Sequence, residues 1–215
     1  MKNVSQHYDE NYFKWQSTLG NFGGWAGMSK FSKYINEDDL VMDFGCGGGF
    51  LLKNIKCKSR IGVEVNKVAA KQAVKNGLKV FDKIKKVPSN YVDVIISNHA
   101  LEHSLNPFFE LKEMCRILKR GGKLIIYVPC ESVFCKYHPS DINHHVFSWS
   151  PSCLGNLLQE AGFELIESKA FFHKWPPKSV LYGKFLGRWL FELMCRIYGI
   201  FTPTFSQVKA VALKK

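Results

Sequence analysis

The stretch Val41–Phe50, VMDFGCGGGF, passes from an apolar run through an acid into a turn with four glycines in five positions. A turn of this kind after a strand lets the backbone come close to a bound nucleotide. A dinucleotide fingerprint GxGxxG that starts at Gly45 requires glycine at position 50, where Phe50 stands. The turn fits GxGxG instead, through Gly45, Gly47 and Gly49. This pattern disfavours a pyrophosphate cofactor and therefore an NAD-dependent oxidoreductase.

Strand and helix patterns alternate along the chain on both sides of this turn. The segments with strand patterns are Leu40–Phe44, Ile61–Val65, Lys79–Phe81, Val92–Ser97, Lys123–Pro129, Phe163–Ile166 and Ser206–Leu213. The segments with helix patterns are Phe50–Ile55, Lys67–Lys75, Pro107–Leu118 and the segment that begins at Ser150-Pro151. The alternation predicts an α/β fold, a Rossmann-like doubly wound sheet of seven strands. We expect the sheet to be mostly parallel, with the last strand antiparallel at its edge.

Composition and length predict one globular domain. The chain has 215 residues, of which 46% are hydrophobic and 22% charged, with a formal net charge of +12. Because its lysines are scattered, the charge alone does not single out nucleic acid as a partner. The chain contains seven cysteines, none in a CxxC pair. This pattern, with no signal peptide at the start, predicts a reducing, cytoplasmic compartment.

We expect the single domain, residues 1–215, to have four parts. An aromatic cap over 1–38 precedes a nucleotide-binding core over 40–170, which a helical insertion over 179–201 and a closing strand over 206–213 follow. In the cap, Tyr8, Tyr12 and Trp15 are candidates either for shaping a pocket or for packing on the sheet edge.

The insertion Ser179–Phe201 is amphipathic. One face carries Lys184, Arg188, Glu192 and Arg196 at four-residue spacing. The other face is apolar and consists of Leu181, Tyr182, Phe185, Leu186, Trp189, Leu190, Leu193, Met194, Ile197 and Tyr198. The charges exclude a transmembrane span. Three interpretations stay open: a lid on the domain, a contact in a homodimer rather than a monomer, and peripheral contact with an anionic membrane.

Two acids point to the kind of nucleotide. Glu64 lies 21 residues after Asp43, at the end of the second expected strand. A carboxylate there accepts hydrogen bonds from both hydroxyls of an unphosphorylated ribose. Asp82 follows the third strand, where it either meets an adenine amino group or is a solvated loop acid. The ligand therefore carries adenosine and needs no phosphate.

Three segments in order, DFGCGGG, GVEVN and DVIISNHALEHSLNPFFELKEMCRILKRGGKLIIYVP, resemble the class I S-adenosylmethionine-dependent methyltransferases. The likeness is greatest to the branch that includes quinone-biosynthesis and polysaccharide-cluster methyltransferases, and it covers roughly Leu40 to Ile166. It implies S-adenosyl-L-methionine as cofactor. The residues it implies for cofactor binding are Asp43, Gly45, Cys46, Gly47, Gly49, Glu64, Val65, Asp82, Asn98 and His99.

The resemblance also implies a role for each of these groups. The glycines pass close to the methionine moiety, Asp43 lies near its amino group, and Glu64 holds the ribose. His99, just past the fourth strand with Asn98, borders the zone of methyl transfer.

Histidines gather in the loop after the fifth strand, a position that hangs over the cofactor from the acceptor side in similar enzymes. A hydroxyl acceptor needs a base, and histidine suits neutral pH. We predict His144 or His145 as the base, with His99 and His138 next. The alternative is that these histidines only hydrogen-bond the loop.

A metal site is not expected in this loop. Cys135, His138, Asp141 and His144 recur every three residues, and all are zinc ligands in other proteins. Pro139 interrupts any continuous helical face between them.

The acceptor class follows from a motif that is absent. Relatives that methylate nucleobase or glutamine nitrogen carry Asn/Asp-Pro-Pro-Tyr/Phe after the fourth strand, whereas this chain has Ser97-Asn98-His99-Ala100. The difference favours O-methylation of a small molecule, a sugar or a lipid-linked intermediate. An RNA methyltransferase and a non-catalytic S-adenosylmethionine-binding module are the alternatives. Nucleic acid is not the expected partner, and the cytoplasmic protein is either free or membrane-associated.

Overall fold

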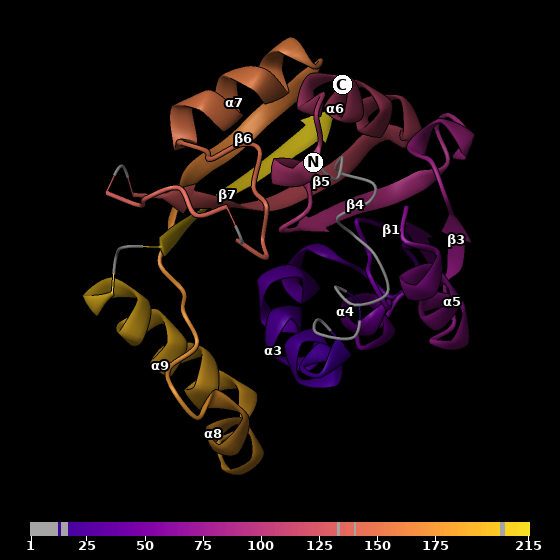
Figure 1. The fold of residues 1–215 in the computed structure, drawn as a ribbon. Coiled ribbons are helices and arrows are strands. Elements are labelled where there is room, and N and C mark those ends of the chain that lie inside the picture. The colour runs from indigo at the N-terminus through magenta and orange to yellow at the C-terminus, as the bar shows by residue number, and fades with distance from the viewer. Residues whose placement is uncertain (1–12, 14–16, 133, 140, 203–204) are drawn as a thin grey trace.

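The computed structural model describes residues 13, 17–132, 134–139, 141–202 and 205–215. In them a seven-stranded sheet carries helices on both faces, and two further helices project from this body (Figure 1). Tyr8, Tyr12 and Trp15 of the expected cap lie outside the described residues, so their roles stay predictions.

The strands confirm the doubly wound sheet. Their bounds are β1 Leu40–Phe44, β2 Ser59–Val63, β3 Lys79–Phe81, β4 Val92–Asn98, β5 Leu118–Glu131, β6 Phe163–Phe171 and β7 Phe205–Lys214. The spatial order is β3-β2-β1-β4-β5-β7-β6. The strands β1 to β5 pair in parallel, and β7 is antiparallel to both of its neighbours. The chain reverses direction across the sheet between β1 and β4, which puts the ligand-binding switch point at their carboxyl ends.

The expectation that the last strand lies at the sheet edge is wrong. Strand β7 lies between β5 and β6, and its Ala210 pairs with Ile126 on one side and Ser168 on the other. Its side chains are buried on both faces, since Lys209 and Val211 are buried like Ala210 and Ala212, which alternate with them. A strand covered on both faces belongs inside a sheet. The strand at the edge is β6.

A second boundary also differs from expectation, at Gly121-Gly122. Helix α6, Pro107–Ile117, ends before this pair, and β5 already begins at Leu118, which pairs with Val92. Gly121 has a φ of +74°, and the β4–β5 register shifts here. The glycines therefore form a bulge inside the strand and do not cap the helix.

The other helices are α3 Gly20–Phe31, α4 Phe50–Lys53, α5 Lys67–Lys75, α7 Pro151–Glu160, α8 Ser179–Phe185 and α9 Arg188–Phe201, with short 3₁₀ turns η1 Ser32–Tyr34, η2 Ile84–Lys86 and η3 Leu101–His103. Asn66, Asn106 and Ser150 accept hydrogen bonds from backbone N–H groups in the first turns of α5, α6 and α7. Proline follows at the first position of α6 and α7, as the sequence predicted for α7.

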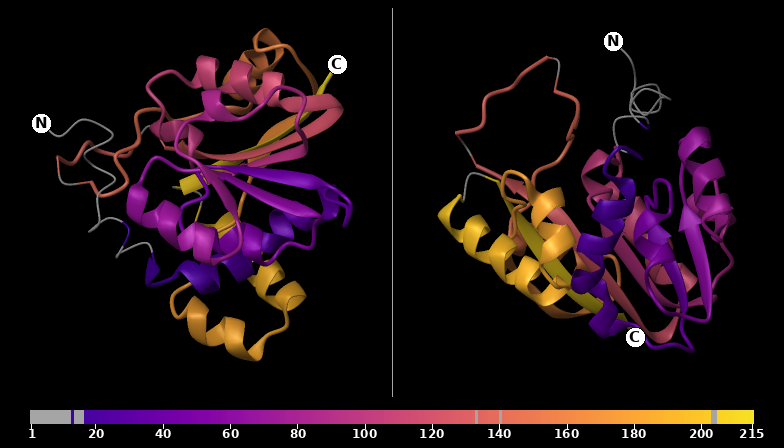
Figure 2. Two further views of the ribbon diagram at one scale, coloured as in Figure 1. Left: turned by 90° about the vertical axis from the view of Figure 1, so that its right-hand side faces the viewer. Right: turned by 90° about the horizontal axis from the view of Figure 1, so that it is seen from below.

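Two hydrophobic cores lie on opposite faces of the sheet. Leu111 and Met114 of α6 and Leu154 and Leu158 of α7 pack on one face. Helices α3, α4 and α5 cover the other face, with Phe31 among the fully buried side chains (Figures 1 and 2). This arrangement leaves the carboxyl ends of β1, β2 and β4 open to a ligand.

The insertion forms two helices, α8 and α9, which lie beside α3 and project from the body (Figures 1 and 2). The side that packs coincides only in part with the predicted apolar face, of which Leu186 and Met194 are partly buried there. Phe191 and Cys195 of α9 are buried against Phe22, Trp25 and Ala26 of α3. Large apolar side chains elsewhere on both helices stay exposed: Val180, Leu181, Tyr182, Phe185, Trp189, Leu190, Leu193, Ile197, Ile200 and Phe201.

Candidate active site

The glycine turn follows β1 and needs glycine for its conformation. Gly45, Gly47 and Gly49 have φ values of +73°, +52° and +72°, a region that other residues adopt only with strain. A Cβ on Gly45 would also lie 2.3 Å from the Cβ of Ala100. The turn therefore packs against the loop that leaves β4. Because glycine has no side chain, the backbone of the turn is accessible at the carboxyl ends of the strands.

Glu64 braces this turn from the end of β2. Its Oε2 accepts a hydrogen bond from the Gly47 N–H at 2.8 Å, and its Oε1 accepts one from the Asn66 N–H at 2.7 Å. Burial raises the pKa of Glu64, although these N–H groups oppose the shift. One carboxylate thus ties the glycine turn to the start of α5.

Asp43 ends β1 as a buried acid. Burial raises its pKa to about 8, and the Glu64 carboxylate adds to the shift. A buried acid of this kind accepts a cationic ligand group favourably, because the cation stabilises its ionised form.

A cavity of about 630 Å³ opens at these strand ends. Seven of the predicted site residues line it: Asp43, Gly45, Cys46, Gly47, Asn98, His99 and His145. The cavity therefore joins the glycine turn, the β4 exit and the loop after β5 into one site. The Cys46 thiol itself points at β2, since a Cβ on Gly62 would lie 2.4 Å from its sulfur, so Cys46 offers its backbone to the cavity.

Six predicted residues are not in the lining. They are Gly49, Glu64, Val65, Asp82, His138 and His144. Gly49 and Glu64 contribute through the shape of the turn. Asp82 is exposed and bound by the Lys86 ammonium at 2.8 Å, which lowers its pKa. The adenine contact predicted for Asp82 would require this ion pair to open.

Sequence reasoning missed one wall of the cavity, which α3 supplies. Gly20, Gly23, Gly24 and Gly27 line it. Their spacing is that of one helix face, a signal present in the segment GNFGGWAG.

Lys30, also on α3, is a buried cation in the same wall. Its ammonium donates to Asn98 Oδ1 at 3.2 Å and to Gln207 Oε1 at 2.9 Å. Burial lowers its pKa to about 8, although the negative charge of Glu192 opposes the shift. The lysine fixes the side chain of Asn98, which the sequence had placed at the cofactor.

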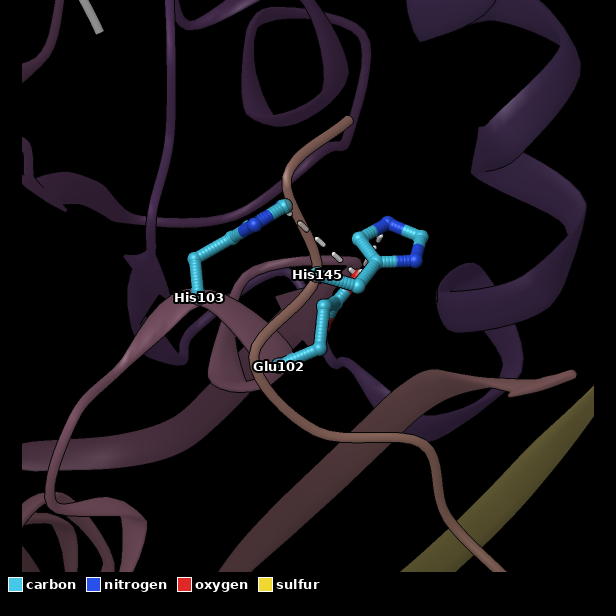
Figure 3. A group of neighbouring side chains, drawn as sticks. All are labelled: Glu102, His103 and His145. Atoms are coloured by element: carbon cyan, nitrogen blue, oxygen red, sulfur yellow. Dashed lines mark ion pairs between the residues drawn. The ribbon is translucent and has the colours of Figure 1, made fainter. Parts of the chain in front are cut away.

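Histidines and acids meet at the other end of the cavity, where η3 faces the loop between β5 and α7 (Figure 3). His99 Nδ1 lies 3.3 Å from Glu102 Oε1. His145 Nδ1 lies 2.6 Å from Glu131 Oε1, and its Nε2 lies 4.0 Å from Glu102 Oε1. Two of the four histidines predicted as bases, His99 and His145, therefore stand next to carboxylates.

Glu102 is the centre of this group. Its backbone carbonyl accepts hydrogen bonds from the N–H groups of Val146 and Phe147 and so ties the loop after β5 to η3. Its side chain is fully buried. Burial opposes ionisation of Glu102, but the contacts with His99 and His103 outweigh this and lower its pKa.

The fold and site together define the class I S-adenosylmethionine-dependent methyltransferases. A family model described as a methyltransferase domain matches residues 25–168, and the chain belongs to this family. Its cofactor is S-adenosylmethionine. The site fits this cofactor, since the bare turn admits the ligand closely and Asp43 supplies a buried acid for a cationic amino group.

Similar proteins agree with this family. Protein MJ1123 of Methanocaldococcus jannaschii, whose function is uncharacterized, is 39% identical over 127 residues, which are 58% of this chain and 60% of that protein. A ribosomal protein L11 methyltransferase of Clostridium botulinum is 37% identical over 72 residues, 32% of this chain and 23% of that enzyme. The matches thus span less than two thirds of either relative.

Solved structures share the fold. A methyltransferase of Thermotoga maritima has a TM-score of 0.67 at 21% identity and matches 95% of both chains. One of Archaeoglobus fulgidus has a TM-score of 0.66 at 19% identity and matches 95% of this chain and all 100% of its own. At these identities the likeness speaks for the fold and leaves the acceptor open.

Proposed function

We propose that this methyltransferase acts on an oxygen of a small molecule, a sugar or a lipid-linked intermediate, with His99 as general base. The observation that carries the proposal is the position of His99, which lines the cavity next to the glycine turn with Glu102 3.3 Å behind its Nδ1. A carboxylate behind one ring nitrogen leaves the other nitrogen to accept a proton.

The geometry favours His99 over the two histidines that the sequence ranked first. Both ring nitrogens of His145 face carboxylates, Glu131 at 2.6 Å and Glu102 at 4.0 Å. His144 is not part of the cavity lining. The assignment of the base to His99 rests on these two differences.

An oxygen acceptor agrees with a base at this place. When bound, S-adenosylmethionine supplies a methyl group on a positively charged sulfur. A hydroxyl that receives the methyl group loses its proton, which His99 takes. Alignment of the acceptor with the methyl group contributes most to the rate, about 7–11 kcal/mol in well-oriented reactions.

In this proposal, the residues around the glycine turn hold the cofactor. Asp43 binds its amino group, the backbone of Gly45 and Gly47 lies along its methionine part, and Glu64 turns toward its ribose. Glu64 can do so while it braces the turn, because each carboxylate oxygen has a second lone pair.

A lipid-linked acceptor is supported by the helices α8 and α9. Phe185, Trp189 and Phe201 are 81%, 74% and 79% exposed, and such a group of apolar side chains normally has a partner. Helix α9 packs on α3, and α3 lines the cavity.

We assign this surface to an anionic membrane because of its charge. Lys178, Lys184 and Arg188 are exposed on or beside the two helices. Arg196 is also exposed and pairs with Glu192 Oε1 at 3.0 Å, while Glu192 Oε2 turns inward to His173 and Ser29. Aromatic and leucine side chains with basic neighbours suit the interface of an acidic bilayer. None of the helices in the described part of the chain has the length and apolarity of a membrane span.

Methyl-labelled S-adenosylmethionine tests the proposal. The protein is incubated with cell extract, which is then separated into lipid, water-soluble small molecules, protein and RNA. We expect label in the lipid or small-molecule fraction, lost with His99→Asn. Label in RNA would favour the RNA methyltransferase, and cofactor binding without any transfer would indicate a non-catalytic binding module.

A further inference from the structure

Three side chains around Glu102 form a second site beside the cavity. One donor atom each of Glu102, His103 and His145 lies within 4.8 Å of the others. Glu102 and His103 belong to η3 and His145 to the loop after β5, so two distant segments supply the group (Figure 3). The recurring Cys135, His138, Asp141 and His144 form no such cluster among the described residues.

The Glu102 carboxylate points into this group and is fully buried. Its closest ion-pair partner among the described residues is His99 Nδ1, 3.3 Å from Oε1, and neither oxygen accepts a hydrogen bond of good geometry. Its Oε1 lies 3.9 Å from His103 Nε2 and 4.0 Å from His145 Nε2. A buried carboxylate in this condition requires a cation or a hydrogen-bond donor at close range.

Both imidazoles are held from behind. Glu131 binds His145 Nδ1 at 2.6 Å, and the backbone of His144 hydrogen-bonds the ring of His103. A histidine that ligates a metal almost always donates its second nitrogen to a carboxylate or a backbone carbonyl. The two rings therefore have the support typical of metal ligands, with Nε2 directed at Glu102.

We propose that Glu102, His103 and His145 bind a divalent transition ion, with zinc as the first candidate. Two imidazoles and one carboxylate are a common ligand set for zinc and for Fe(II), Co(II) and Ni(II). Bonds of ~2.0–2.1 Å place the ligand atoms about 3.3 Å apart in a tetrahedral site. The two distances from Glu102 are 3.9 and 4.0 Å, and all three ligand atoms lie within 4.8 Å of one another, so rotations of the three side chains have to bring them together.

Charge balance supports a divalent ion here. Glu102 and Glu131 bring two carboxylates to the site. Their described ion pairs are with histidines and include no lysine or arginine. A bound dication would neutralise both. Since His145 and Glu131 also line the cavity, the ion would lie at its acceptor end. That last consequence rests on the proposed function, whereas the site itself does not.

Calorimetry on metal-free full-length protein tests the proposal. Chelator-treated protein is titrated with Zn²⁺, and the visible spectrum of Co²⁺ reports whether nitrogen and oxygen atoms are the ligands. The ligand variants are Glu102→Gln, His103→Gln and His145→Gln. His144→Asn is the matched control, since it alters the neighbouring histidine in the same loop, and Cys135→Ser excludes binding through an exposed thiol.

We expect one zinc ion per chain and unchanged affinity in both controls. Glu131→Gln should weaken binding roughly 10–100-fold, as for other carboxylates behind metal-binding histidines, and the ligand variants should weaken it further. Absence of saturable binding by the wild type, or wild-type affinity in His103→Gln and His145→Gln, would overturn the site. Titration of each protein with S-adenosylhomocysteine shows that it is folded and tests the cofactor pocket separately.

Discussion

Gly24 of α3 lies so close to Phe50 that a Cβ atom on it would be 2.0 Å from the Phe50 carbonyl oxygen. The contact joins the glycine wall of the cavity to the first turn of α4. We predict that Gly24→Ala lowers the free energy of unfolding by about 1–3 kcal/mol, because the backbone of Phe50 cannot move aside without strain.

Gly27→Ala, one turn along the same helix, is the matched control. Its Cβ would meet only Leu51 Cδ1 at 3.4 Å, and alanine favours a helix over glycine by about 1 kcal/mol. Urea denaturation should therefore give an unchanged or slightly raised stability for Gly27→Ala. Equal losses in the two variants would contradict the close approach of α3 and α4.

The pKa of Asp43 predicts how stability depends on pH. The folded value is about 8 against an ordinary value of 3.8, so between these limits the folded state binds the extra proton. Stability from this group is fully present below the lower value and is lost as pH rises through about 8.

Asp43→Asn removes this dependence. The melting temperature of the ligand-free variant, relative to wild type, should therefore rise from pH 6 to pH 8.5. Thermal melts of both proteins in one buffer series measure the difference, in which all other titrating groups cancel. Parallel pH profiles would show that Asp43 is not a buried acid of raised pKa.

His99 has a φ of +55°, which asparagine tolerates well. His99→Asn should therefore fold normally and lower kcat by about 10²–10⁴-fold, the usual contribution of a general base. The affinity for S-adenosylhomocysteine should hardly change. His144 has a φ of +48° and is not part of the cavity lining, so His144→Asn should keep wild-type kcat. A large loss of kcat in His144→Asn, with wild-type kcat in His99→Asn, would instead identify His144 as the base.

The exposed face of α8 and α9 predicts binding to acidic vesicles. The double variant Phe185→Ser/Trp189→Ser should lose sedimentation with phosphatidylglycerol vesicles, and salt should weaken binding of the wild type. Leu105→Ser removes a side chain that is 71% exposed elsewhere and serves as control. If the wild type instead dimerises through this face and ignores vesicles, the surface is a subunit contact.

Local patterns predicted most of the fold, because β1, β3 and α5 have the bounds that apolar runs and caps indicated. The position of β7 could not be predicted in this way, since pairing with β5 and β6 depends on contacts distant in sequence. The same holds for α9, where apolar side chains surround the helix and only the packing of Phe191 on α3 decides the buried face.

The same distinction between local and tertiary features applies to the candidate site. Glycines, Asp43 and the histidine loop carry local signals, and the cavity brings most of them together. The contacts of Glu102 with His103 and His145, and the ion pair that holds Asp82 in solvent, arise from tertiary structure. No spacing in the sequence shows them.

Titration calorimetry with S-adenosylhomocysteine and, separately, NAD tests the cofactor site most directly, on wild type, Glu64→Ala and Asp82→Asn. We predict that S-adenosylhomocysteine binds and that NAD does not. Glu64→Ala should weaken the affinity for S-adenosylhomocysteine at least tenfold, about 1.4 kcal/mol, and Asp82→Asn should have little effect on it. Binding of NAD, or equal affinity in wild type and Glu64→Ala, would contradict a cofactor held at the glycine turn that Glu64 braces.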